Sequence, residues 1–168
     1  MSWSLHAIPL HEAANEGVLE WAAAASSSRG VPDRASASTP LPTVADVLGV
    51  FGDAGCHGTA WFTIVEAEAA PSLTECPNPG ACARVGGLDL GEVGLRVVGQ
   101  GDIGLAVPSD ARVKEISFRK PSGVAVLTAV CELTLIAGPQ LVFDDLADRV
   151  FVVWPDELTE DLVREWPW

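Results

Sequence analysis

A chain of 168 residues has the length of one ordinary domain and can bury a core without support from disulfides or a metal. Its hydrophobic fraction of 48%, with 20% charged residues, excludes an intrinsically disordered protein. Ten Lys and Arg against 23 Asp and Glu give a formal net charge of −13. This charge repels phosphates and anionic lipids, so we expect neither nucleic acid nor membrane as a partner.

The N-terminal segment has no basic region followed by an apolar run, so it does not resemble a secretory signal. No apolar run reaches the roughly 18 residues of a spanning helix. The longest one, GVAVLTAVCELTLIAG, is interrupted by Thr128, Glu132 and Thr134. We therefore expect a cytoplasmic protein whose four cysteines mostly stay reduced.

In chain order, the first predicted element is a helix in the alanine-rich stretch 11–27, which Gly17 weakens. The following stretch, SSSRGVPDRASASTPLP, is rich in Ser and Pro and is typical of a linker. We therefore divide the chain into residues 1–41, an N-terminal helix with a linker, and residues 42–168, the main domain.

The main domain begins with a clear helical pattern in VADVLGVFGDAG, for which Thr43 is a suitable N-cap. The β-branched and aromatic stretch TAWFTIVEAEA predicts a strand, and the Pro- and Gly-rich stretch 71–87 predicts a loop. Further strands are predicted in LDLGEVGLRVVG and VKEISFRK.

The most apolar helix is predicted over residues 123–138, with Ser122 as its cap and Gly138 as its end. LVF (141–143) and VFVVW (150–154) then form a predicted hairpin, and a last helical turn lies within 156–165. The fold class expected is α+β, with a mainly antiparallel sheet of about five strands packed against two or three helices.

A zinc site is one chemical hypothesis, because thiolate and imidazole are zinc ligands and the chain has Cys56, His57, Cys76 and Cys82. The spacing argues against it, since CPNPGAC is wider than the usual C-x₂₋₄-C pair. Adjacent side chains on a strand point to opposite faces, so only one of Cys56 and His57 could easily be a ligand. The alternative is that these are reduced or packed cysteines, with Cys131 in the core.

Catalytic motifs are not recognised in the chain. His6, His11 and His57 are the only histidines, and no G-x-S-x-G elbow is present. The Gly-rich stretches GGLDLGEVG and VGQGDIG match neither phosphate-loop pattern. We therefore expect no catalytic residues, no cofactor, and a protein that is not an enzyme.

Acidic residues are concentrated near the C-terminus: residues 144–165 contain eight Asp and Glu residues but only two arginines. Tryptophans lie among them, and tryptophan is enriched at protein-binding hot spots. Asp is also common in turns for structural reasons alone. The candidate partner-binding residues are Asp144, Asp145, Asp148, Asp156, Glu157, Trp166 and Trp168.

These observations favour an acidic, cytoplasmic binding module that engages a basic protein partner. By physical analogy, and not by family resemblance, such a module fits an immunity or inhibitor protein against a basic bacterial toxin. The alternative is a small zinc protein or enzyme that uses Cys56, His57, Cys76 and Cys82. No oligomeric state is predicted.

Overall fold

The computed structural model describes residues 3–34, 37–65, 72–100 and 106–168. A seven-stranded sheet forms its centre, in the order β2-β9-β8-β1-β7-β5-β3. Its strands are β1 (Ser4–Pro9), β2 (Ser27–Arg29), β3 (His57–Ala60), β5 (Asp89–Val97), β7 (Val113–Arg119), β8 (Gln140–Asp144) and β9 (Arg149–Val153). A separate parallel pair is formed by β4 (Thr63–Val65) and β6 (Ala106–Pro108).

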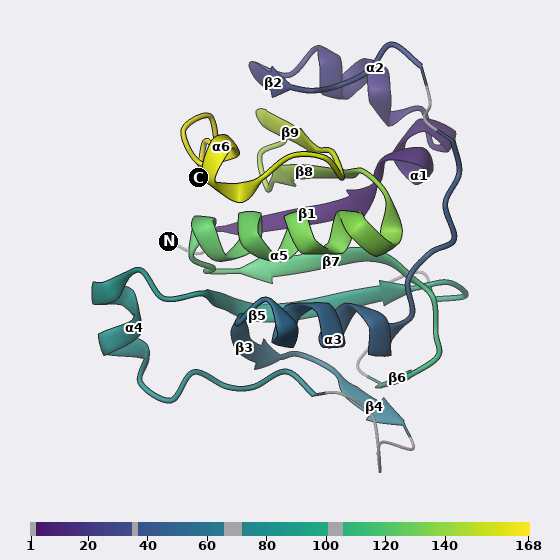
Figure 1. Cartoon of the computed structure of the whole chain (residues 1–168). Coiled ribbons are helices and arrows are strands. Elements are labelled where there is room, and N and C mark those ends of the chain that lie inside the picture. Colours follow the sequence, from purple (N-terminus) through teal and green to yellow (C-terminus); the bar gives the residue numbers. More distant parts are fainter. Residues whose placement is uncertain (1–2, 35–36, 66–71, 101–105) are drawn as a thin grey trace.

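Two helices cover one face of the sheet, namely α3 (Val44–Asp53) and α5 (Gly123–Ala137) (Figure 1). Thr43 caps α3 through a capping box, because its hydroxyl accepts from Asp46 N–H while the Asp46 carboxylate accepts from Thr43 N–H. The apolar side chains of both helices and of the inner strands form the larger core cluster.

A smaller core cluster lies under α1 (Leu10–Asn15) and α2 (Val18–Ala23). Side chains alternate along β9, so that Phe151 and Val153 belong to the larger cluster and Val152 to the smaller one. This explains the continuous apolar run of β9, since a strand buried on both faces needs no polar positions.

The predicted α+β class is confirmed, but the predicted sheet was only roughly right. The pairs β2–β9 and β3–β5 are parallel, whereas β1–β7, β1–β8, β5–β7 and β8–β9 are antiparallel. The sheet is therefore mixed and larger than the expected sheet of about five strands.

The N-terminal segment differs most from its prediction. β1 pairs with both β7 and β8 in the middle of the sheet, so the boundary expected near residue 41 does not separate this segment from the rest. The expected single helix is two short ones, because Gly17 between them has φ +74°. Within the expected linker, residues 27–29 form β2.

Later elements follow the sequence pattern more closely, with β5, β7, α5, β8 and β9 where they were expected. Ser122 occupies the N-cap position of α5 but makes no side-chain capping bond. The expected loop 71–87 contains a helix, α4 (Pro79–Val85), and the last helical turn is α6 (Thr159–Leu162). The expected strand 59–69 is split between β3 and β4, and its end lies outside the described residues. In the described part of the chain, no helix is both long and apolar enough to span a bilayer.

Candidate functional site

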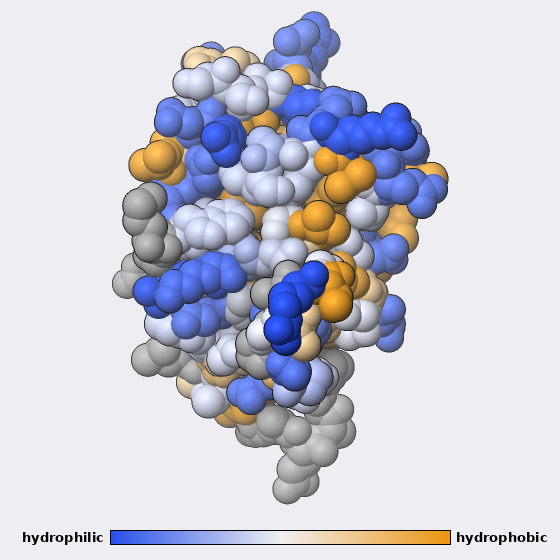
Figure 2. Space-filling model, turned by 90° about the vertical axis from the view of Figure 1, so that its left-hand side faces the viewer, coloured by the Kyte–Doolittle hydropathy of each residue, from blue (hydrophilic) through white to orange (hydrophobic). Residues whose placement is uncertain are grey.

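Most of the candidate residues lie at one end of the sheet. The register places Ser4 opposite Arg119, Glu92 opposite Arg119, and Leu5 opposite Asp144, so these strand ends share one side of the molecule. We call this side the strand-end face. Figure 2 views it and shows mainly hydrophilic and intermediate residues, with hydrophobic ones in small separate patches.

The turn between β8 and β9 presents the first three candidate carboxylates. Asp144 holds the turn itself, because its backbone carbonyl accepts from Ala147 N–H at 2.9 Å and its side chain accepts from Asp148 N–H at 3.2 Å. Ala147 has φ +58°, a left-handed conformation that a non-glycine residue adopts at a cost. The two hydrogen bonds of Asp144 thus give this residue a structural role in the turn.

Asp145 and Asp148 project from this turn and are exposed. The Asp145 carboxylate accepts from Ser4 N–H at 2.7 Å and lies 3.3 Å from Nε2 of His6. Within the described part of the chain, no Lys or Arg forms an ion pair with Asp144, Asp145 or Asp148. Among the described residues, the turn carboxylates therefore have no Lys or Arg counter-charge, and the basic side chain beside Asp145 is His6.

A cavity of about 510 Å³ adjoins these carboxylates. Leu146, 80% exposed, and the partly buried ring of Trp168 give it apolar walls, and Arg149 brings one positive charge. The Trp168 indole donates to the Asp144 carboxylate at 3.3 Å. We call Asp144, Asp145, Leu146, Asp148 and Trp168 the turn surface.

Trp166 is placed differently from Trp168. It is 8% exposed, packs edge-on against Phe151 with ring centroids 4.9 Å apart, and donates its indole N–H to Gly123 O at 2.9 Å. A Cβ on Gly123 would collide with the Trp168 carbonyl oxygen, so the C-terminal segment packs closely on the start of α5. Trp166 therefore anchors the C-terminus in the core.

Asp156 and Glu157 follow the opposite end of β9 and do not join the turn surface. Glu157 accepts from Trp154 N–H at 3.0 Å and forms an ion pair with Arg29 at 2.6 Å. Arg29 also pairs with Glu165 at 3.3 Å. The acidic run of the sequence is thus split into an open group and a group partly neutralised within the fold.

The sulfur and imidazole candidates lie on the β3 side of the strand-end face. His57, Cys76 and Cys82 bring one ligand atom each to within 4.8 Å of one another, and Cys82 Sγ lies 3.2 Å from His57 Nε2. We call these three residues the His–Cys cluster. The expectation that Cys56 and His57 could not easily both be ligands agrees with this arrangement.

Cys56 points away from the cluster into the core, with its thiol 3.8 Å from Ala125 O. Burial raises its pKa to about 11, so this thiol stays protonated and unreactive at neutral pH. Cys131 is also buried, as expected, and its pKa is raised first by that burial.

Local backbone signals explain how Cys76 and Cys82 meet in spite of their spacing. Asn78 caps α4 by accepting from Ala81 N–H at 3.1 Å, and α4 ends at Gly86, whose φ of +67° suits glycine. The intervening helix turn folds Cys82 back toward Cys76. The predicted loop is therefore wrong at residues 79–85, where an Asn-Pro pair begins a short helix that ends in Gly-Gly.

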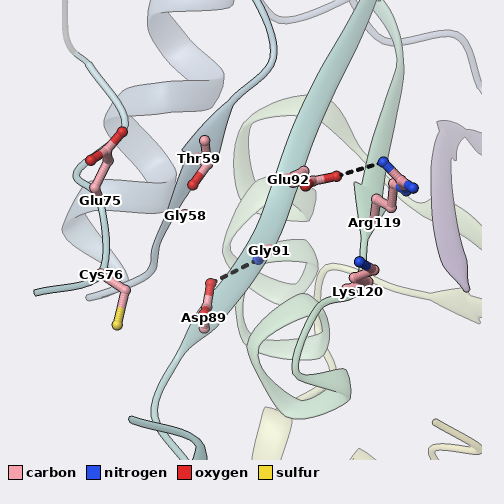
Figure 3. A pocket seen from close by; sticks show the side chains of 9 residues that line it. All are labelled: Gly58, Thr59, Glu75, Cys76, Asp89, Gly91, Glu92, Arg119 and Lys120. Atoms are coloured by element: carbon pink, nitrogen blue, oxygen red, sulfur yellow. Dashed lines mark hydrogen bonds and ion pairs between the residues drawn. The ribbon is translucent and has the colours of Figure 1, made fainter. Parts of the chain in front are cut away.

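Burial and neighbouring groups disfavour the thiolate form of Cys82. The pKa of Cys82 is raised by partial burial, by the Cys76 side chain and by the Asp89 carboxylate. An adjoining cavity of about 270 Å³ is lined by Gly58, Cys76 and Asp89 together with Thr59, Glu75, Gly91, Glu92, Arg119 and Lys120 (Figure 3). In Figure 3, Cys76 and Asp89 come from separate segments, the loop before α4 and the start of β5.

His6, on the unpredicted strand β1, forms a partly buried network with two carboxylates. Its Nδ1 lies 2.9 Å from the Glu115 carboxylate, which also pairs with Arg96. The hydrogen bond to Glu115 is the largest cause of a raised His6 pKa, and Asp145 adds to it against the effect of burial. Burial would raise the Glu115 pKa, but His6 and Arg96 outweigh it and the pKa is lowered.

Comparison of the chain with family models, curated proteins and solved structures finds no match.

Proposed function

We propose that this protein is a non-catalytic, cytoplasmic binding module that engages a basic protein through the turn surface, as an inhibitor of a basic bacterial toxin would. The observation that carries the proposal is the set of three turn carboxylates without a Lys or Arg partner in the described structure, beside a cavity with apolar walls. No cofactor is needed for this role.

The charge of the turn suits recognition of Lys or Arg. Asp145 and Asp148 are exposed, and the whole chain carries a net charge of −13, so a basic surface is attracted over a distance of about one Debye length. The same field disfavours nucleic acid and anionic membranes as direct partners.

The apolar part of the turn surface suits retention of the partner. Leu146 is exposed on the turn, and the ring of Trp168 lines the same cavity. Burial of such side chains slows dissociation, whereas the carboxylates speed association. Arg149 in the cavity wall selects against a partner whose contact is uniformly basic.

The other candidate residues have different parts in this proposal. Trp166 anchors the C-terminal segment that carries Trp168, and is not itself a contact. Asp156 and Glu157 contribute to the long-range field only, because they lie at the other end of β9.

The test is affinity capture from the native organism with three versions of the full chain as bait. These are the wild type, the turn variant Asp144→Asn/Asp145→Asn/Asp148→Asn, and the control Asp33→Asn/Asp110→Asn/Glu132→Gln. The control changes exposed residues on other elements and alters the net charge equally. We expect a basic protein to be retained by the wild type and the control and lost from the turn variant.

Association rates with the captured protein then test the mechanism. The wild-type rate should fall steeply with salt, and the turn variant should associate about tenfold or more slowly at low salt. Equal retention or equal rates for the turn variant and the control would remove the turn surface from the mechanism.

A further inference from the structure

We propose that His57, Cys76 and Cys82 bind one Zn²⁺ ion, with one coordination position open to the adjoining cavity. This site is separate from the turn surface and does not depend on the role proposed for it. It concerns three of the four residues that the sequence suggested as ligands, and leaves out Cys56, whose thiol faces Ala125 in the core.

The spacing of the three ligand atoms fits a tetrahedral ion. Zn–S and Zn–N bonds of about 2.0–2.3 Å place neighbouring ligand atoms roughly 3.3–3.8 Å apart. The three atoms all lie within 4.8 Å of one another, and the Cys82–His57 pair is at 3.2 Å. Small side-chain rotations are enough to close the site around an ion.

The donor set selects the kind of ion. Two thiols and an imidazole favour Zn²⁺ over Mg²⁺ and Ca²⁺, which prefer oxygen ligands. In the described part of the chain this is the one group of three or more His, Cys, Asp and Glu side chains with metal-binding geometry. None of the many carboxylates near the C-terminus forms such a group, although they outnumber the cysteines.

Backbone hydrogen bonds hold the ligands in place before any ion binds. The loop that carries Cys76 is fixed to β3 by Gly58 N–H, which donates to Thr74 O at 2.9 Å. His57 N–H donates to Leu88 O at 3.0 Å, and Gly87 N–H to Cys82 O at 2.8 Å. The ligands thus come from three segments, a strand, a loop and a helix, that already meet at this corner.

Few apolar side chains pack at this corner, so a bound ion would have a structural role. Among the described side chains of residues 72–88, only Leu73 and Leu88 pack against the larger core cluster, and both are only partly buried. A bound ion would join α4 and the loop before it to the edge strand β3. It would do so where hydrophobic burial contributes little.

Three protein ligands leave a fourth position, and the cavity of about 270 Å³ lies beside Cys76 to supply it. The nearby Asp89 carboxylate accepts from Gly91 N–H at 2.8 Å, which holds it at the wall of the cavity. Water or a small ligand from solvent therefore completes the coordination.

The first experiment titrates the reduced full-length chain with Zn²⁺ and with Co²⁺. We expect one equivalent of either ion and, for Co²⁺, thiolate charge-transfer absorption in the near ultraviolet. Separate variants Cys76→Ser, Cys82→Ser and His57→Asn should weaken binding by more than the roughly 10–100-fold that loss of an outer-shell partner costs. Cys131→Ala is the matched control and should bind as the wild type does.

Two further readouts sharpen the result. Imidazole added to the Co²⁺ form should change its visible spectrum, because one position is open. Saturating Zn²⁺ should slow amide exchange in residues 72–88, by up to about 100-fold at 100 times the dissociation constant. The near-ultraviolet circular dichroism of the tryptophans checks that each variant is folded.

Three outcomes would overturn the proposal. One is a reduced wild-type chain that binds Zn²⁺ no more tightly than the Cys76→Ser/Cys82→Ser double variant. Another is equal loss of binding in Cys131→Ala. The third is a Cys76–Cys82 disulfide that persists under conditions that reduce glutathione disulfide. A Co²⁺ spectrum that imidazole leaves unchanged would contradict the open position.

Discussion

Acidic residues lie beside both ends of strand β9, but they differ in whether an arginine pairs with them. At the start of β9, Asp145 and Asp148 are exposed and no Lys or Arg of the described chain pairs with them. Beyond its end, Glu157 is paired with Arg29, which also holds Glu165. Charge counted along the sequence therefore overstates the charge available to a partner, because part of it is neutralised by a residue from a distant segment.

The C-terminal segment connects the two ends of β9, because it runs from the end of this strand back to the β8–β9 turn, where Trp168 donates to Asp144. Trp166 fixes this return by packing on Phe151 and by donating to Gly123 O. Loss of this anchor should therefore disturb both ends of β9.

Trp166→Ala should have the largest effect on stability. It removes a buried ring and leaves a cavity, so we expect a loss of about 3–5 kcal/mol in the free energy of unfolding, measured with urea. Trp166→Phe, which keeps most of the ring but loses the hydrogen bond, should cost clearly less. A loss below about 1 kcal/mol for Trp166→Ala would mean that the segment is not anchored here.

Arg29→Ala should be next. It removes two ion pairs and the contact of the guanidinium with the Phe151 ring, 5.0 Å from its centroid. Because Arg29 is partly exposed, we expect a loss of about 1–2 kcal/mol. The control Arg34→Ala changes the net charge equally at an exposed site and should cost little.

The same pair of variants tests which end of β9 meets the partner. If only the turn surface makes contact, Arg29→Ala and Arg34→Ala should change the association rate with a captured basic protein to the same small extent. A larger increase for Arg29→Ala would show that the carboxylates it releases also take part.

His6 should make stability depend on pH. Its pKa is raised above 6.5 in the folded state, so its contribution is complete below that value and is lost as pH rises through the folded-state pKa. The Glu115 pKa is lowered from 4.5, so its contribution is complete above that value and is lost as pH falls through the folded-state pKa.

His6→Gln should therefore destabilise the protein most between these two values, by about 1 kcal/mol, and progressively less at higher pH. Urea unfolding of the wild type and the variant from pH 5 to pH 9 gives this difference. The other histidines are present in both proteins, so their contributions cancel. A difference that grows with rising pH would contradict the assigned network.

Asp156→Asn should have the smallest effect. Asp156 is exposed beyond the end of β9, so stability should change by no more than about 0.5 kcal/mol. The association rate should change less than it does for Asp145→Asn, although both variants lose one charge. Equal effects on the rate would show that the long-range field alone matters.

Much of the fold could be predicted where one local signal was strong. Thr43 and the apolar spacing after it predicted α3, and the alternation of residues 113–120 predicted β7. β1 was missed because six residues with His, Ala and Pro carry little strand preference, and only its pairing with β7 and β8 makes it central.

The candidate sites were predictable in composition and not in arrangement. The sequence supplied the acids and the cysteines, but the spacing rule argued against a pair separated as Cys76 and Cys82 are. Their proximity to His57 arises from the short helix α4 and from backbone bonds to β3, neither of which has a periodic signal.

By itself the sequence determined the quantities that add up over residues, namely the negative charge, the apolar content and the strong local elements. Only the tertiary structure decided which charges stay open, which cysteines meet and where the N-terminal strand lies. Those outcomes depend on contacts between distant segments, and their energy cannot be read from either segment alone.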